Sequence, residues 1–599
     1  MRVYDICANV YPVIYWFTMG SNSSSDLPCS TSHQIDAVLC LGLRTGRRLT
    51  CITWKLMNRG TMEVFTSILL AGIIGLLVVT VSSAGRNKPA PLPPGPPGLP
   101  FLGNLHQLTK AKGGRQRQFY KDLHAKYGPI VALRAGPFRT IISIADGKIA
   151  DELMNKRGAV YGGRPHLHIM DIVGKHRFAM MTYNAEWRES RKVSHALLGT
   201  HAAEKFHTFQ EYENLQFLNR MLHAPEKYRE WTKLFSLSVI LSVLYGMRID
   251  DLESPVTKAL QKTADNLANL LLPGRFLVDS FPFIRHLPDF FNSWRAKGRA
   301  YYEDAIGFWI PFWEVCKENI ETGKTPHTFG GALLKHQKED PEKWTDLRIG
   351  YGLMGSLVFA GADTTAIWTT VFYVIAGLHT ECVKKAQAEL DEVVGPNRLP
   401  TWEDEPSLPY VHAFIKECHR WQGIAPFALP HATTQDDVYN GYHIPAGSVI
   451  SAQVHIINRD PAHYSSPDTF DPTRFLNHTL SASASATQSD PMKRDHFSYG
   501  FGRRMCPGIH VAEASLFLQV SRLLWGFDIA RPVWKKTGKA VKDFAEFDIF
   551  VSYSAAAAEI DTKISSRGPA YAQVMEEEAA NARTELGKIH AETQPESTQ

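Results

Sequence analysis

One cysteine, Cys506, lies in a loop crowded with glycines close to the C-terminus. The loop Phe497–Gly508 reads FSYGFGRRMCPG, and the apolar stretch after it, Ile509–Trp525, has the pattern of a helix. Glycine lets the backbone approach a ligand closely, and the free N–H groups at a helix start favour a thiolate. This arrangement is typical of an axial thiolate ligand of iron, whose charge the nearby amides temper. The alternative is a buried structural cysteine in a turn.

Composition narrows the possible classes of protein. The chain of 599 residues is 44% hydrophobic and 21% charged, which is typical of a globular protein. Its net charge is only +5, so the charge balance indicates no nucleic-acid partner. The eight cysteines contain no CxxC pair, a pattern that excludes a disulfide framework and fits a reducing compartment.

An apolar segment in the N-terminal part predicts a membrane anchor. Residues 64–81 read VFTSILLAGIIGLLVVTV, carry no charge and are long enough to cross a bilayer core. Arg86 and Lys88 follow, and the PLPPGPPGLP run at 91–100 forms a stiff, extended spacer. A signal peptide or a buried core helix is the alternative. The two basic residues indicate that the body after the spacer lies in the cytoplasm.

The residues before this segment complicate the topology. They carry further basic side chains, which compete for the same side of the membrane. Met62 stands two residues before the apolar run, and a chain starting there would lack the conflict. We therefore interpret residues 1–61 as an optional or wrongly assigned N-terminal extension.

Three further patterns place polar residues on predicted helices. Ala360–Thr365 reads AGADTT and interrupts a long apolar stretch, where polar residues are costly unless they have a role. A helix bend, with Thr bonding back to the preceding turn, is the alternative. Glu417 and Arg420 share a helix face and can pair, although most such pairs are surface bridges. Trp187 and Arg191 share a face at i, i+4 spacing.

The cysteine loop resembles the signature of the cytochrome P450 family, Phe-x-x-Gly-x-Arg-x-Cys-x-Gly. Gly502, Arg504, Cys506 and Gly508 match it, and Tyr499 stands where the family usually has Phe. The AGADTT segment resembles the family's oxygen-activating motif, and the Trp187 helix resembles its Trp-x-x-x-Arg helix. These motifs occur in the family's order, and the resemblance extends from the proline-rich spacer to the polar tail.

The resemblance implies a cofactor, haem b (heme, iron protoporphyrin IX), with Cys506 as the axial thiolate and the only protein ligand of the iron. Arg504 and its neighbour Arg503 would pair with the haem propionates. Trp187 and Arg191 would contact a propionate, and His431 falls where many relatives place a further propionate donor.

The resemblance also assigns roles to residues that would not contact the haem propionates. Asp363 and Thr364 would relay protons to dioxygen, and Gly361 would leave room for the oxygen. Glu417 and Arg420 would belong to the family's Glu-x-x-Arg helix, with Arg474 as their third partner. In the segment that contains Arg474, the family often has Glu where this chain has Thr473. We interpret this triad as structural.

The expected fold is mainly α with a small β region, the cytochrome P450 fold, with one N-terminal transmembrane helix. The predicted segments are an N-terminal extension (1–61), the anchor (62–84), a basic and proline-rich linker (85–100), a haem-thiolate catalytic domain (101–567) and a polar, solvated tail (568–599).

The expected function is that of a monooxygenase. It would insert one oxygen atom from O2 into an apolar small-molecule substrate, and the resemblance to fungal microsomal members implies a secondary metabolite. Electrons would come from an NADPH-dependent flavoprotein reductase, and membrane lipid would hold the protein at the endoplasmic reticulum. Two alternatives remain open: a haem-thiolate isomerase or dehydratase that needs no O2, and a non-enzymatic haem-binding protein. The acid–alcohol pair Asp363 and Thr364 disfavours both.

Overall fold

The computed structural model describes residues 90–110, 115–272, 274–289, 292–325, 327–542 and 560–585. The predicted extension and anchor, together with the start of the linker, lie outside these residues. The part described belongs to a single compact unit that begins at Pro89.

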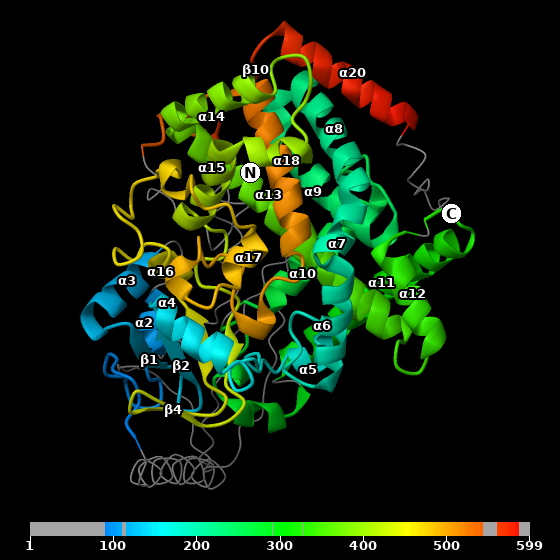
Figure 1. Cartoon of the computed structure of the whole chain (residues 1–599). Coiled ribbons are helices and arrows are strands. Elements are labelled where there is room, and N and C mark those ends of the chain that lie inside the picture. Colours follow the sequence, from blue (N-terminus) through cyan, green and yellow to red (C-terminus); the bar gives the residue numbers. More distant parts are fainter. Residues whose placement is uncertain are drawn as a thin grey trace, which may run out of the picture. The chain divides into compact units, whose positions relative to one another are not determined.

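Helices make up most of this unit (Figure 1). They are α2 (Leu105–Lys110), α3 (Gln116–Tyr127), α4 (Gly147–Ala150), α5 (Met170–Val173), α6 (Ala185–Leu198), α7 (Thr200–Ala203), α8 (His207–His223), α9 (Tyr228–Tyr245), α10 (Pro255–Leu270), α11 (Ser293–Glu321), α12 (Phe329–Glu339), α13 (Gly355–Leu378), α14 (Thr380–Val393), α15 (Pro409–Trp421), α16 (Val454–Ile457), α17 (Ala482–Ala486), α18 (Ile509–Gly526) and α20 (Pro569–Glu585).

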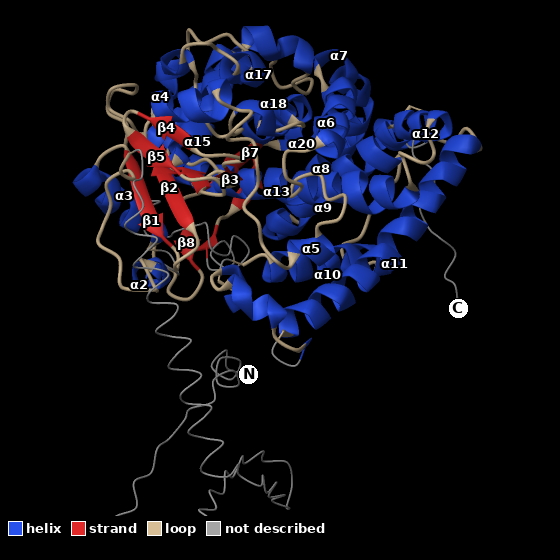
Figure 2. Ribbon diagram, turned by 90° about the horizontal axis from the view of Figure 1, so that it is seen from below, coloured by secondary structure: helices blue, strands red, loops and turns tan. Residues whose placement is uncertain are grey.

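The strands are short, and those of the largest sheet gather to one side of the helices (Figure 2). They are β1 (Ile130–Arg134), β2 (Thr140–Ile144), β3 (His431–Ala432), β4 (Asp437–Tyr439), β5 (Tyr442–Ile444), β6 (Val449–Ala452), β7 (Phe527–Ile529), β8 (Val533–Trp534), β9 (Ile560–Asp561) and β10 (Ile564–Ser566). The largest sheet has the order β1-β2-β6-β3, in which β2 and β6 are parallel and the other neighbours antiparallel. The prediction of a mainly α fold with a small β region is confirmed.

Helix α13 is apolar on nearly every side because it runs through the core, in contact with α9 and α18. Its close approach to α9 depends on Gly361, where a Cβ would lie 2.6 Å from the Ile240 side chain. Ser236 of α9 also donates its hydroxyl to the Gly361 carbonyl at 3.0 Å. Among the described residues, Leu347–Leu378 is the one helix long and apolar enough to cross a bilayer. Its packing is that of a core helix.

The segment after residue 568 differs from the expectation of a solvated tail. Residues 569–585 form α20, which packs along α8 (Figure 1) and buries Met575, Ala579 and Ala582. Gln216 of α8 donates to the Ala579 carbonyl at 3.2 Å. The sequence shows a weakly helical acidic stretch around Glu576–Glu578, and its narrow apolar stripe is recognisable only once α8 provides a surface to cover.

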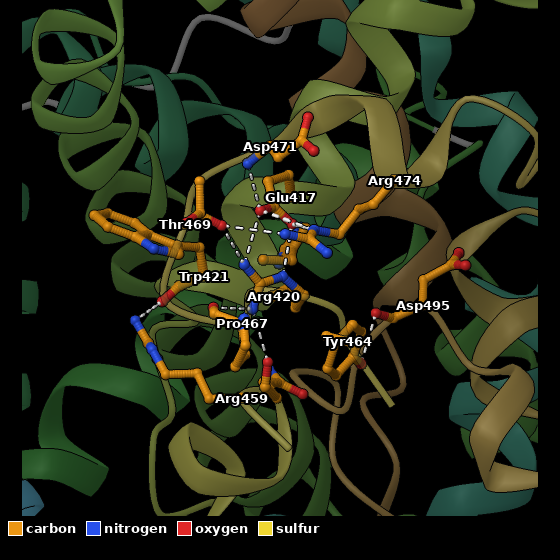
Figure 3. Close-up of polar contacts among 12 residues, drawn as sticks. Glu417, Arg420, Trp421, Arg459, Tyr464, Pro467, Thr469, Asp471, Arg474 and Asp495 are labelled. Atoms are coloured by element: carbon orange, nitrogen blue, oxygen red, sulfur yellow. Dashed lines mark hydrogen bonds and ion pairs between the residues drawn. The ribbon is translucent and has the colours of Figure 1, made fainter. Parts of the chain in front are cut away.

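The predicted triad is present and buried (Figure 3). The side chains of Glu417 and Arg420 are fully buried. Arg420 Nε and Nη2 lie 2.6 and 2.7 Å from the two carboxylate oxygens of Glu417. Arg474 Nε lies 3.1 Å from Glu417 Oε2, and the Asp471 backbone N–H donates to Oε1 at 2.8 Å. The remaining Arg420 N–H groups donate to backbone carbonyls. Because every charge has a partner, the triad joins α15 to the segment around Arg474 without an unpaired ion.

Candidate active site

A cavity inside the unit is bordered by α9, α13, α18 and the loop that leads into α18. Cys506 lines it from the loop, and Thr364 lines it from α13. Ala360 and Thr364 are exposed in the middle of a core helix because they face this cavity. The rest of the wall is largely apolar and includes Phe235, Val239, Ile240, Leu357 and Val511. The structure therefore brings two of the predicted site residues to one apolar cavity.

The geometry of the cysteine loop depends on its glycines. Gly502 has a φ of +52°, and a Cβ there would lie 2.1 Å from the Met154 carbonyl oxygen, so no other residue fits this position. The Cys506 N–H donates to the Tyr499 carbonyl at 3.0 Å, which closes the loop. Burial raises the pKa of the Cys506 thiol, whereas the Gly508 N–H and the charge of Arg191 lower it. A coordinated metal ion would favour the thiolate further.

Thr364 and Asp363 lie differently. The Thr364 hydroxyl donates to the Ala360 carbonyl at 2.6 Å, the backbone bond that the sequence allows as an alternative role. Asp363 does not line the cavity; burial raises the pKa of its carboxyl, Lys233 of α9 lowers it and Asp265 of α10 raises it. The two side chains therefore lie on different sides of α13. The Thr364 hydroxyl lies at the cavity, and the Asp363 carboxyl lies toward α9 and α10.

A group of cations lies beside the loop. Asn184 caps α6 by accepting from the Trp187 N–H at 2.8 Å, and the Trp187 ring lies 3.9 Å from the Arg504 guanidinium. Arg504 donates to the carbonyls of Gly162 and Met181, while its buried Nη1 has no hydrogen-bond partner. Burial, followed by the charges of Arg164 and Arg191, lowers the pKa of Arg504 to about 9. Within the described residues, none of these three arginines forms an ion pair with a carboxylate.

His431 belongs to the same group. Its ring is buried in β3, and its Nδ1 donates to the Tyr161 carbonyl at 2.9 Å, because a carbonyl can only accept. Burial, then the charges of Arg164 and Arg504, lowers the pKa of His431 to about 3. Donation from Nε2 to an anion therefore requires a second ring proton, which a nearby anion would favour.

Arg503 has a different partner from its neighbour Arg504. Its side chain is exposed and donates to the Tyr183 hydroxyl, whereas Arg504 is half-buried and donates to backbone carbonyls. The sequence cannot separate the two neighbouring arginines, because their directions depend on how residues 162–183 wrap around the loop.

The chain is similar to known proteins over most of its length. Residues 93–540 match the sequence model of the family described as cytochrome P450. The chain is 36% identical to the cytochrome P450 monooxygenase polD of Polytolypa hystricis, over 87% of this chain and 98% of that protein. It is 34% identical to virE of Hypocrea virens, over 84% and 91%, and 33% identical to monooxygenase 231 of Postia placenta, over 81% and 92%. The chain belongs to the cytochrome P450 family.

Membership of this family implies a haem with a cysteine thiolate as axial ligand, and the residues of this P450 fit that group. The cavity is apolar, as a porphyrin requires, and a thiol closes one of its walls. Arg164, Arg191 and Arg504 have no carboxylate partner in the part of the chain that the structure describes, and one of them has an unsatisfied buried N–H, which suits the carboxylates at a porphyrin's edge. An unpaired buried cation is costly, so an anionic partner there stabilises the folded P450.

Arg164 is a site residue that the sequence analysis missed. Its guanidinium donates to the carbonyls of Ala179, Leu429 and Pro430, which joins three separate segments beside His431. Burial lowers the pKa of Arg164 to about 10. The only signal in the sequence is a Gly-Gly-Arg-Pro turn, which by itself resembles an ordinary surface turn.

Proposed function

We propose that this P450 is a membrane-attached monooxygenase that inserts one oxygen atom from O2 into an apolar organic substrate. The observation that carries the proposal is that Cys506 and Thr364 face one apolar cavity from separate elements. A thiol supplies the ligand, a hydroxyl supplies a proton site, and apolar walls exclude water. An isomerase or dehydratase needs no such proton site, which disfavours that alternative.

The cofactor of the proposal is haem b, with Cys506 as its axial ligand. When bound, it supplies the electron transfer and the activation of O2, with the thiolate as electron-rich donor. Trp187, Arg191 and Arg504 would hold its propionates, and His431 would join them once protonated at Nε2. Arg164 would support this group by holding the backbone carbonyls of Ala179, Leu429 and Pro430 in place.

Proton delivery would use both sides of α13. Asp363 lies toward Lys233 and Asp265, and its raised pKa favours a carboxyl that can hold a proton and release it. Thr364 lies at the cavity, where its hydroxyl can accept one proton and donate another. Ser236, Thr365 and Ser515 also line the cavity, but the Ser236 hydroxyl donates to the Gly361 carbonyl and Ser515 accepts from Gln210.

Replacing Thr364 by alanine should uncouple NADPH consumption from product formation. Removal of the hydroxyl leaves the cavity without its proton site, so the ratio of product to NADPH should fall by about tenfold or more. Haem binding and substrate affinity should change little, because the side chain is small. The measurement is product formed against NADPH and O2 consumed.

Thr370→Ala is the matched control. Thr370 lies on the same helix and bonds back to Ala366 at 2.8 Å, as Thr364 does to Ala360, but it does not line the cavity. Its variant should stay coupled. Equal coupling in wild type and Thr364→Ala would mean that the hydroxyl only bends the helix, and turnover without O2 consumption would favour the isomerase.

The proposed partners are an NADPH-dependent flavoprotein reductase for electrons and membrane lipid for attachment at the endoplasmic reticulum. The family's use of a redox partner supports the first. Similarity to fungal monooxygenases supports a substrate from secondary metabolism.

A group of exposed apolar side chains supports attachment to lipid. Leu277 and Phe283, in the segment between α10 and α11, are 69% and 54% exposed, and Phe138 between β1 and β2 is 60% exposed. The two segments touch, because a Cβ at Gly136 would lie 3.2 Å from the Ser280 carbonyl oxygen. Apolar side chains grouped on a surface mark a site of interaction, and a lipid surface is the partner that we propose for them.

A chain that begins at Lys88 should still bind haem but partition less into membranes, because the described unit begins at the next residue. Adding Leu277→Asp and Phe283→Asp should lower vesicle binding further, by about tenfold for each side chain removed from lipid. Vesicle sedimentation measures this.

Leu476→Asp, at an exposed leucine away from that segment, is the control and should leave vesicle binding unchanged. A shortened chain that cannot fold would place residues 64–81 in the core and contradict the anchor.

A further inference from the structure

Three polar aromatic side chains connect α13 with the cysteine loop. Trp368 lies one turn after Thr364 on α13, and its indole N–H donates to His419 Nδ1 at 3.0 Å. His419 belongs to α15, and its Nε2 lies 3.4 Å from the Tyr499 hydroxyl oxygen. Tyr499 in turn accepts the Cys506 N–H at its carbonyl. A continuous polar path therefore leads from the helix of the proton site to the backbone of the thiol.

The chemistry of the three groups determines the direction of each bond. An indole N–H can only donate, so His419 Nδ1 must accept. Burial and the neighbouring His496 keep the pKa of His419 well below its ordinary value, so the ring is neutral and carries its proton on Nε2. That N–H faces the Tyr499 oxygen, which accepts it. Trp368 thus orients the imidazole, and the imidazole orients the phenol.

The same histidine holds the loop at a second point. The Ser498 hydroxyl donates to the His419 carbonyl at 2.8 Å. The ring of His496, two residues earlier in the chain, stacks on the His419 ring with centroids 4.7 Å apart. Successive residues of the loop are therefore attached to one residue of α15, and a shift of His419 would move the loop.

We propose that Trp368, His419 and Tyr499 form a bridge of positioning residues that sets where Cys506 stands relative to the Thr364 side of the cavity. The inference rests on the proposed function, because it takes Cys506 as the iron ligand. None of the three side chains needs to touch the reacting atoms. Their effect is to keep the loop from moving away from α13, so that the thiolate stays in place.

Tyr499 offers a clean test because the family usually has Phe at this position. Tyr499→Phe keeps the ring and removes only the hydroxyl, so neither a cavity nor a misfolded loop is expected. The readout is the red-shifted absorption of the reduced carbonyl complex, which requires a thiolate ligand. In the variant this band should form but should be lost about fivefold faster, the factor that corresponds to one neutral hydrogen bond.

Tyr464→Phe is the matched control. Tyr464 is also buried, but its hydroxyl donates to the Asp495 carbonyl at 3.0 Å, outside the bridge. Its variant should lose the band at the wild-type rate. The temperature of global unfolding should be the same for both variants, so a general loss of stability would not mimic the result.

A double-mutant cycle tests whether the path runs through His419. Trp368→Phe and Tyr499→Phe change side chains that both bond to His419, so their effects on the rate of band loss should be non-additive. The pair Trp368→Phe and Tyr464→Phe should be additive. Additive effects in the first pair, or a Tyr499→Phe enzyme that loses the band at the wild-type rate, would overturn the bridge. A band that persists in Cys506→Ser would instead overturn the proposed function itself.

Discussion

Replacing Cys506 by serine is expected to abolish the red-shifted absorption of the reduced carbonyl complex completely. A hydroxyl is a much weaker donor than a thiolate, and the loop offers the cavity no second sulfur or imidazole. Haem can remain in the apolar cavity, since the arginines of the site are unaffected. The measurement is the absorption spectrum of the reduced protein with carbon monoxide, set against its haem content.

Cys418→Ser is the control for this change. Cys418 is a buried free cysteine on α15 and does not line the cavity, so its variant should keep the band. A band that survives in Cys506→Ser with full haem content would mean that another residue binds the iron. The proton role of Thr364 would then lose its basis as well.

Replacing Glu417 by alanine should prevent accumulation of folded, haem-loaded protein. The change leaves Arg420 fully buried without its carboxylate and removes a partner of Arg474. Breaking a buried ion pair from one side costs about 3–5 kcal/mol, a large share of the roughly 5–15 kcal/mol by which a domain is stable. Soluble yield and haem content per milligram measure the effect.

Glu381→Ala is the matched control for this prediction. Glu381 and Lys384 form an exposed pair at the same i, i+3 spacing, with 2.9 Å between the charged atoms. Removing an exposed pair costs at most about 1 kcal/mol, so this variant should express and bind haem as the wild type does. A Glu417→Ala protein that is well folded and replete with haem would show that the triad is dispensable.

Several features of the site were predictable because they are local. The Cys506 loop needs glycine at position 502, where the backbone passes Met154, and the family signature marks this position directly. The Glu417 and Arg420 pair lies within a single helical turn, so its spacing predicts the contact. The family's pattern also anticipated Arg474, although no local rule connects it with α15.

Other features depended on packing between segments far apart in the chain. The sequence pairs Asp363 with Thr364 as neighbours, yet successive residues of a helix point about 100° apart. Only the positions of α9 and α10 decide which of the two faces the cavity. Arg164 lies near Arg504 and His431, which are hundreds of residues away in the chain, and its charge lowers the pKa of both. A lone arginine in a turn carries no sign of such neighbours.

The sequence by itself determined the helical class, the cysteine loop and the structural ion pair, because each follows from patterns within a few residues or from a family signature. The tertiary structure decided that α20 packs on α8, that Arg503 is exposed beside Tyr183 while Arg504 is half-buried, and that Trp368 and Tyr499 meet at His419. These contacts form only when separate helices and loops come together. The side chains involved have no preference for one another until burial removes water as a competing partner.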